Sequence, residues 1–169
     1  MRKGEALALR YSDVDHKAGL IRLTRQLRFP NGQNQGEIVE YLKMGHAGRN
    51  IPIPAQLKPW LEKDTSDRLL FGDDNKPMSM QQYRNKWTRI TKKIDLHGAT
   101  AHALRHTYLT LANNGGIDPK SLQALAGHSS CSFTMNQYVH AQDDQLLKVG
   151  EKISQFLPSI PPEAATSAP

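Results

Sequence analysis

His102-Ala-Leu-Arg105-His106, followed by Gly127-His128 and then by Tyr138, is the most informative part of this sequence. It places an arginine, three histidines and a tyrosine within 37 residues. The first two histidines and Arg105 are spaced i, i+3 and i+4, so in a helix they project from one face. A guanidinium fork beside imidazoles, with a tyrosine nearby, supplies the groups needed for attack of a tyrosine hydroxyl on a phosphodiester.

The residues around this stretch predict helices with defined ends. Thr100 is a suitable N-cap, and Gly115-Gly116 is a suitable C-terminal stop. Asp118-Pro119 predicts the start of a second helix, which Gly127 ends. Ser79 predicts the cap of an earlier helix that runs to about residue 94. Further helices are expected over residues 4–10, 55–63 and about 142–156, with a short one carrying Tyr138.

Alternating apolar residues in the first third of the chain predict strands over residues 20–29, 37–43 and 49–53. Short turn-rich links between them favour an antiparallel meander. Strands are few beside the predicted helices. We therefore expect an α+β fold, mainly helical, with a small three-stranded antiparallel sheet at one edge.

Composition favours one soluble domain. The chain has 169 residues, of which 38% are hydrophobic, and this is enough for a core. No apolar run approaches the ~20 residues of a membrane span, and the first residues do not resemble a signal peptide. The single cysteine, Cys131, excludes an internal disulfide and suits a reducing cytoplasm. We expect a cytoplasmic protein with no membrane partner.

Charge favours a polyanionic partner. The net charge is +6, and residues 1–100 hold 18 Lys/Arg against 11 Asp/Glu, whereas residues 101–169 hold 4 against 5. The predicted helix at 79–94 concentrates part of this excess. Its basic residues are candidates for tracking DNA phosphates, namely Arg84, Lys86, Arg89, Lys92 and Lys93.

Five segments in this order resemble the conserved boxes of one family. They are residues 1–15, the hairpin segment Tyr41-Leu-Lys-Met-Gly-His-Ala-Gly-Arg-Asn-Ile-Pro-Ile, and the motifs His102-x-Leu-Arg-His, Leu125-Ala-Gly-His and Tyr138-Val-His. Over about residues 1–157 the chain resembles the catalytic domain of the tyrosine recombinases, also called the phage integrase family. Each segment alone is weak evidence, but the ordered combination is specific.

The resemblance implies a role for each matching residue. Arg2, Lys43, His102, Arg105, His128 and Tyr138 match the six catalytic positions, with Tyr138 as the nucleophile. Glu5 and His106 match positions that support the site. The implied domain fold is that of the recombinase catalytic domain, over residues 1–157 and truncated at its N-terminus. Residues 158–169, with four prolines, are expected to form a disordered tail.

The implied reaction explains why these residue types are needed. A tyrosine hydroxyl has an ordinary pKa near ~10 and requires activation at neutral pH. Two guanidinium forks, assisted by His128, neutralise charge on the scissile phosphate. Lys43 protonates the departing 5′ oxygen, and His102 moves the tyrosine proton. The product is a 3′-phosphotyrosyl link that a second 5′-hydroxyl reverses without ATP, and family members need no metal or other cofactor.

The resemblance also implies partners. Family members act on double-stranded DNA as tetramers, so we expect a homo-oligomer on DNA and a monomer when the chain is isolated. We expect the helix at about 142–156 to dock on a neighbouring protomer. The resemblance implies integration or excision of a phage or mobile element. Phosphate contacts by the basic residues would position the DNA without reading its bases.

Three alternatives share parts of this pattern. A zinc hydrolase could use His102, His106 and His128, but zincins need glutamate where Ala103 stands, and Arg105 would repel the cation. A non-catalytic DNA-binding fragment of an integrase would need only the basic helix. A type IB topoisomerase would use the same tyrosine attack without exchanging strands.

Overall fold

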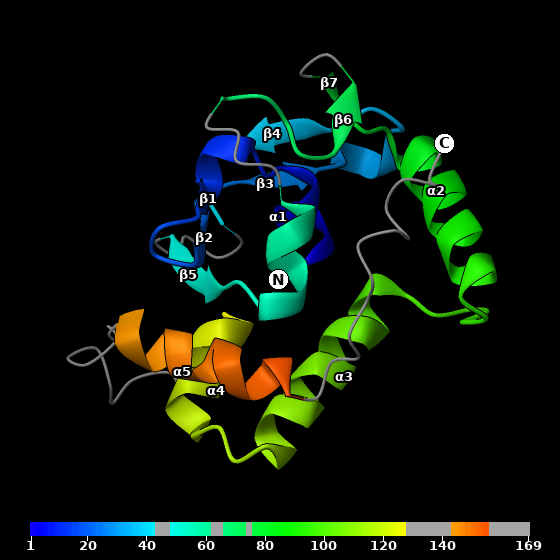
Figure 1. Cartoon of the computed structure of the whole chain (residues 1–169). Helices are drawn as coiled ribbons and strands as arrows, with labels where there is room; N and C mark the ends of the chain where they lie inside the picture. The colour runs from blue at the N-terminus through cyan, green and yellow to red at the C-terminus, as the bar shows by residue number, and fades with distance from the viewer. Residues whose placement is uncertain (43–47, 62–65, 74–75, 128–142, 156–169) are drawn as a thin grey trace.

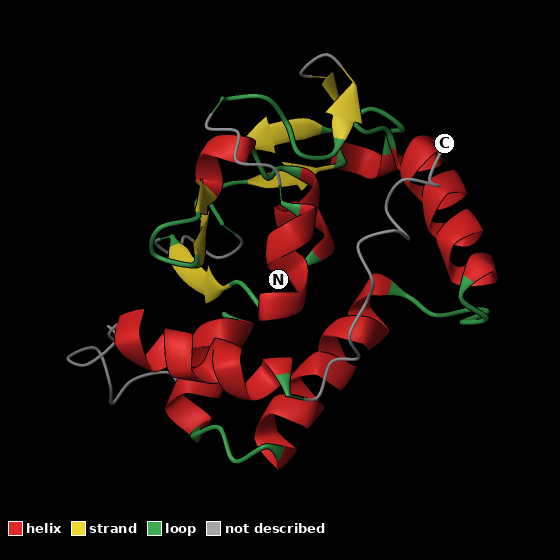
Figure 2. Ribbon diagram, in the orientation of Figure 1, coloured by secondary structure: helices red, strands yellow, loops and turns green. Residues whose placement is uncertain are grey.

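The computed structural model describes residues 1–42, 48–61, 66–73, 76–127 and 143–155. Lys43, His128 and Tyr138 lie outside the described residues, as do the short helix predicted around Tyr138 and the tail from residue 158. The elements follow one another as α1 Lys3–Leu7, η1 Tyr11–Asp13, β1 Val14–Asp15, β2 Leu20–Leu23, β3 Gln26–Arg28, η2 Pro30–Gly32, β4 Glu37–Val39, β5 Arg49–Pro52, η4 Ala55–Trp60, β6 Gly72–Asp73, β7 Lys76–Pro77, α2 Met80–Lys93, α3 Ala101–Asn114, α4 Pro119–Ala126 and α5 Asp143–Ser154. The α+β, mainly helical class is confirmed (Figure 2).

A small antiparallel sheet lies at one edge, as expected, but its strands differ from the prediction. The three-stranded sheet has the order β1-β2-β5, with Ile21 opposite Val14 on one side and Ile51 on the other. Strands β3 and β4 form a separate two-stranded sheet, and β6 pairs with β7. The meander of three consecutive strands was therefore wrong, because β2 pairs across the sequence with β5 and the short β1 was not predicted.

The strand predicted over residues 20–29 breaks at Thr24 and Arg25. Arg25 leaves the strand path to bind Asp13 with two hydrogen bonds of 2.9 and 2.7 Å, and its Nε donates to Glu40 at 3.1 Å. Asp13 is 6% exposed, so its buried carboxylate needs this partner. An ion pair between distant residues thus overrides the local alternation.

The predicted caps define the helices that follow. The side chains of Ser79, Thr100 and Asp118 each accept a hydrogen bond from a backbone N–H in the first turn of α2, α3 and α4. Gly127 ends α4 in the left-handed conformation, with φ of 58°. The helix expected at 55–63 is instead the 3₁₀ helix η4, which contains Pro59, a residue that cannot donate a backbone hydrogen bond.

Helices α3, α4 and α5 pack together against one side of the three-stranded sheet, while α2 lies apart from them (Figure 1). The core combines Leu20, Leu23 and Ile51 of the sheet with Val149 and Ile153 of α5. These two α5 residues are 5% and 4% exposed. Because α5 packs on the core of its own chain, the expectation that the helix at about 142–156 docks on a neighbouring protomer is wrong for residues 143–154.

Within the part of the chain that the structure describes, no helix has the length and apolar character needed to cross a membrane.

Candidate active site at the end of helix α4

Helix α1 begins with a linked pair of charged residues. Glu5, in the first turn, accepts hydrogen bonds from the backbone N–H of Arg2 and from Arg2 Nη1, the latter at 3.1 Å. A carboxylate at this position satisfies an otherwise unpaired N–H and is favoured by the helix dipole. The same contacts that start the helix therefore also hold the Arg2 guanidinium in place.

Glu5 is bound from the other side by the first residue of β5. Arg49 Nη1 and Nη2 donate to Oε1 and Oε2 of Glu5 at 3.0 and 2.8 Å, in a bidentate fork. Glu5 is 1% exposed, and the Arg49 side chain is 14% exposed. Burial by itself raises the pKa of Glu5, but the hydrogen bonds from Arg49 and Arg2 outweigh it and lower the pKa to about 2. Glu5 is therefore ionised at neutral pH.

Two arginines meet at the C-terminal end of α4. Arg2 Nη2 donates to the carbonyl oxygen of Gly127 at 2.7 Å, and Arg105 Nη2 donates to that of Ala126. The last carbonyls of a helix lack intrahelical partners and carry partial negative charge, so they attract guanidinium groups. Residues 2 and 105, far apart in sequence, are thus brought together directly before position 128.

The site carries more positive than negative charge. Among the described residues of the site, three guanidinium groups, those of Arg2, Arg49 and Arg105, surround the carboxylate of Glu5. Burial lowers the pKa of Arg105, and repulsion from Arg2 adds to this effect, although a guanidinium stays protonated in proteins. An anion placed between the arginines would relieve the repulsion, so the arrangement favours binding of a phosphate.

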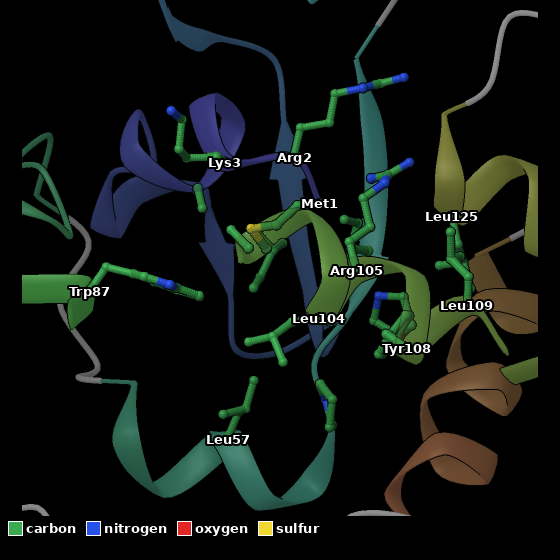
Figure 3. A pocket seen from close by; sticks show the side chains of 16 residues that line it. Met1, Arg2, Lys3, Leu57, Trp87, Leu104, Arg105, Tyr108, Leu109 and Leu125 are labelled. Atoms are coloured by element: carbon green, nitrogen blue, oxygen red, sulfur yellow. The ribbon is translucent and has the colours of Figure 1, made fainter. Parts of the chain in front are cut away.

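A pocket of about 300 Å³ lies beside the arginines, between α1, α3, β5 and η4. Its walls are largely apolar and include Leu57, Trp87 and Leu104. Figure 3 shows the side chains of Arg2 and Arg105 extending in the same direction, away from the apolar wall that Leu57 and Leu104 form.

The histidines of α3 are placed differently. His102 and His106 are exposed, and their rings meet edge to face with centroids 4.4 Å apart and Nε2 atoms 2.8 Å apart. This hydrogen bond requires one Nε2 to donate and the other to accept. The common helical face predicted for His102, Arg105 and His106 is present, but only Arg105 turns into the arginine cluster. Among the described residues, no group of three or more His, Cys, Asp or Glu side chains is arranged to hold a metal ion.

The five basic residues predicted to bind DNA are all exposed on α2. The opposite side of α2 is anchored: Tyr83 stacks on Trp87, whose Nε1 donates to the carbonyl of Ala99 at 2.7 Å. Lys3 lies 5.1 Å from the centroid of the Tyr83 ring and so connects α1 to α2. The basic residues take no part in the ion pairs around Glu5, and they form a separate surface from Arg84 to Lys93.

Sequence reasoning missed Arg49. A signal was present, because Arg49, Ile51 and Ile53 alternate through β5 and the residue that follows it, and both isoleucines are buried. An arginine on the same face as two buried apolar residues requires a carboxylate partner. Nothing in the local sequence identifies that partner as Glu5, which lies 44 residues earlier.

Residues 1–145 match the phage integrase family, and the chain belongs to it. It is 25% identical to a XerC-like tyrosine recombinase of Caldanaerobacter subterraneus over 92% of this chain and 46% of the relative. It is 31% identical to the tyrosine recombinase XerD of Corynebacterium glutamicum over 88% of this chain and 46% of the relative. The transposase of transposon Tn916 from Enterococcus faecalis is 30% identical over 53% of this chain and 24% of its own length.

Solved structures agree with this assignment. The Tn1549 transposon integrase in complex with a circular intermediate DNA superposes with a TM-score of 0.60 at 28% identity, over 86% of this chain and 52% of that one. The same integrase with transposon right end DNA gives a TM-score of 0.58. The chain thus spans about half the length of the two tyrosine recombinases and of the Tn1549 integrase.

Proposed function

We propose that this chain is the catalytic part of a site-specific DNA recombinase, which cleaves and rejoins DNA strands through a 3′-phosphotyrosyl intermediate. The observation that carries the proposal is the meeting of Arg2 and Arg105 at the end of α4, directly before His128. Membership of the phage integrase family supports it. Phage or mobile-element integration and excision fit the relatives, which include the Tn916 transposase and the Tn1549 integrase. The reaction would take place on cytoplasmic DNA.

In this mechanism the scissile phosphate binds between Arg2 and Arg105, whose guanidinium groups neutralise the charge that develops on the nonbridging oxygens. His128 adds a hydrogen bond to the same oxygens. His102, in contact with His106, accepts or relays the proton of Tyr138 as its hydroxyl attacks phosphorus. The P–O5′ bond breaks, and Lys43 protonates the leaving oxygen. Glu5 and Arg49 touch no substrate atom, and the assigned residues complete these steps without a metal.

Exposed basic residues on α2 would track the DNA backbone, because phosphate contacts by Lys and Arg dominate non-specific affinity. DNA-bound structures of a Tn1549 integrase with the same fold support DNA as the partner. We include assembly into a tetramer on DNA in the proposal, with the isolated chain a monomer. Sedimentation with and without duplex DNA tests both states.

The decisive experiment is covalent capture of DNA. Supercoiled plasmid and nicked duplexes are incubated with the protein in EDTA, denatured, and examined for protein-linked DNA. An adduct is expected on the 3′ end of the cleaved strand, and Tyr138→Phe should abolish it. Tyr11→Phe is the matched control, because the Tyr11 ring contacts Arg68 with 4.6 Å to the centroid, and phenylalanine preserves this contact.

An adduct that persists in Tyr138→Phe would contradict the proposal, as would an adduct on the 5′ end. Because the chain spans about half of its relatives, the assay is repeated with the whole reading frame from which it comes, on the DNA flanking that gene. If that protein forms no adduct, the recombinase function is wrong.

A non-catalytic DNA-binding fragment is the second candidate, favoured by the exposed basic residues of α2. It predicts salt-dependent duplex binding that Lys92→Ala and Arg84→Ala weaken, each reducing the slope of log K against log salt by about 1. Binding of this kind without any adduct in the full reading frame would favour this second candidate.

A further inference from the structure

Arg49 occupies a central place among the charged groups of the site. It binds both oxygens of Glu5, and Glu5 in turn binds the backbone and the side chain of Arg2. The three residues form one chain of contacts from β5 to the start of α1. Moving Arg49 would therefore release Glu5 and, through it, Arg2.

Arg49 also contacts the end of α4. A Cβ atom added to Gly127 would lie 2.8 Å from Arg49 Cζ and 2.9 Å from Nη1, so the guanidinium lies directly against the Gly127 backbone. The carbonyl of Gly127 is the second acceptor for Arg2. Arg49 thus touches both groups that orient Arg2, namely Glu5 and Gly127.

The geometry argues against a direct contact of Arg49 with substrate. Both of its terminal nitrogens bind Glu5, and its side chain is 14% exposed, compared with 31% for Arg2. A guanidinium that is buried and bidentately paired with a carboxylate cannot turn to a DNA phosphate without leaving Glu5 uncompensated. Arg49 therefore acts through its neighbours.

We propose that Arg49 is a positioning residue for DNA cleavage, which fixes the Arg2 guanidinium through Glu5 and holds the end of α4 from which the chain continues to His128. The proposal rests on the recombinase function proposed above. It predicts that loss of Arg49 slows the chemical step more than it weakens DNA binding, because misplacing a transition-state contact by about 1 Å can lower a rate ~100-fold.

The first test measures single-turnover cleavage of a nicked duplex at saturating protein, with duplex affinity measured separately. Arg49→Met should lower the cleavage rate about 100-fold and change the affinity by less than about threefold, whereas Arg49→Lys, which keeps the charge but loses the fork, should recover part of the rate. The double variant Arg49→Met/Glu5→Gln should be no slower than the slower single variant, because both residues act in one chain of contacts.

Arg25→Met is the matched control. Arg25 also makes two hydrogen bonds to a buried carboxylate, that of Asp13, and its side chain is 17% exposed. The two variants break similar ion pairs, but only Arg49 contacts the site. Equal loss of cleavage by Arg25→Met and Arg49→Met would mean that Arg49 acts only through stability, and the proposal would be wrong.

A second test does not depend on cleavage and so separates this proposal from the recombinase function. The side-chain N–H signals of Arg2 and the carboxyl signal of Glu5 are followed by NMR in the wild-type protein and in Arg49→Met. The charged groups around Glu5 are Arg2, Arg49, Arg105 and the amino group of Met1. Arg49→Met should shift the Arg2 signals and let Glu5 take up a proton at higher pH.

The outcomes are distinct. Unchanged Arg2 signals in Arg49→Met overturn the positioning role, whether or not the protein cleaves DNA. Shifted Arg2 signals in a protein whose full reading frame never forms an adduct would show that Arg49 orders Arg2, but would reject the recombinase function and with it a role in DNA cleavage. A wild-type cleavage rate combined with weaker DNA binding in Arg49→Met would identify Arg49 as a DNA contact, and this would also overturn the proposal.

Discussion

The arginine side and the histidine side of the candidate site are held in different ways. Arg2 and Arg49 share the carboxylate of Glu5, which is 1% exposed, and contact the end of α4. His102 and His106 are exposed on α3, and the hydrogen bond between them joins two residues one helical turn apart. Tertiary packing orders the first pair, whereas local helical geometry orders the second.

The difference matches the two kinds of chemistry proposed for the site. Stabilising charge in a transition state requires donors fixed in advance, because reorganisation during the reaction would lower the gain. A proton-transfer group must exchange protons with its surroundings, and an exposed histidine can do so. The arginine proposed to bind charge, Arg2, is therefore anchored to the buried carboxylate of Glu5, and the histidines proposed to transfer protons lie at the surface.

The largest expected effect is on the arginine side. Glu5→Gln preserves volume but leaves Arg49 and Arg2 without a buried counter-charge, so we expect a loss of about 3–5 kcal/mol in the free energy of unfolding. Urea unfolding measures it. Asp15→Asn removes the carboxylate of the Arg22–Asp15 pair, whose arginine side chain is 61% exposed, and should change the midpoint far less. Equal losses would mean that the buried ion pairs of Glu5 stabilise the protein no more than the exposed Arg22–Asp15 pair does.

Acid should have the next largest effect, because protonation of Glu5 weakens its ion pairs with Arg2 and Arg49. The folded pKa of Glu5 is about 2, below its ordinary value of 4.5. The stabilisation from this residue is therefore fully present above pH 4.5 and is lost as pH falls toward 2, by about 3 kcal/mol at roughly 1.4 kcal/mol per pKa unit. The slope of unfolding free energy against pH in this window should be smaller in Glu5→Gln than in the wild-type protein; parallel slopes would contradict the assignment.

Alanine substitutions at two glycines distinguish the cost of backbone strain from the cost of displacing Arg49. Gly116 and Gly127 both have positive φ, 72° and 58°, but a Cβ on Gly116 meets nothing within 4 Å, whereas one on Gly127 meets Arg49 at 2.8 Å. Gly116→Ala should cost about 1–2 kcal/mol from strain alone. Gly127→Ala should cost roughly 1–3 kcal/mol more because Arg49 must move. Thermal unfolding of both variants measures the difference in unfolding free energy. Equal losses would show that Arg49 moves away from the new Cβ atom without cost.

The smallest effect is expected on the histidine side. His106→Asn removes the partner of His102 from an exposed position, so unfolding free energy should change by no more than about 0.5 kcal/mol. Cleavage should slow, because the His102 ring loses the hydrogen bond that orients it. Thr110→Ala, exposed on the same helix, is the control for helix stability. A loss of stability comparable to that of Glu5→Gln would remove the contrast between the two sides.

Local chemistry explains how far the sequence alone predicts this fold. Ser79, Thr100 and Asp118 cap their own helices, and Gly127 ends α4, because each acts on backbone groups within four residues. The spacing of His102, Arg105 and His106 likewise follows from helical periodicity. Family motifs predict that Arg2 and Arg105 are site residues, and the structure brings both to the end of α4. The catalytic roles of these two arginines, like those of Lys43, His102, His128 and Tyr138, stay predictions.

Features that depend on distant partners were not predictable. The strand at 20–29 breaks where Arg25 binds Asp13, and β2 pairs with β1 and β5 rather than with β3, the next strand along the chain. Helix α5 packs on its own core because Val149 and Ile153 find apolar partners in the sheet.

The sequence by itself determined helices α2, α3 and α4, their caps and the membership of a family, because capping and periodicity act between residues a few positions apart. Only the tertiary structure decided that Arg49 and Glu5 pair across 44 residues and that Arg2 and Arg105 meet at one helix end. Those contacts depend on which surfaces pack together and on where buried charges find partners, and neither is encoded in a local pattern.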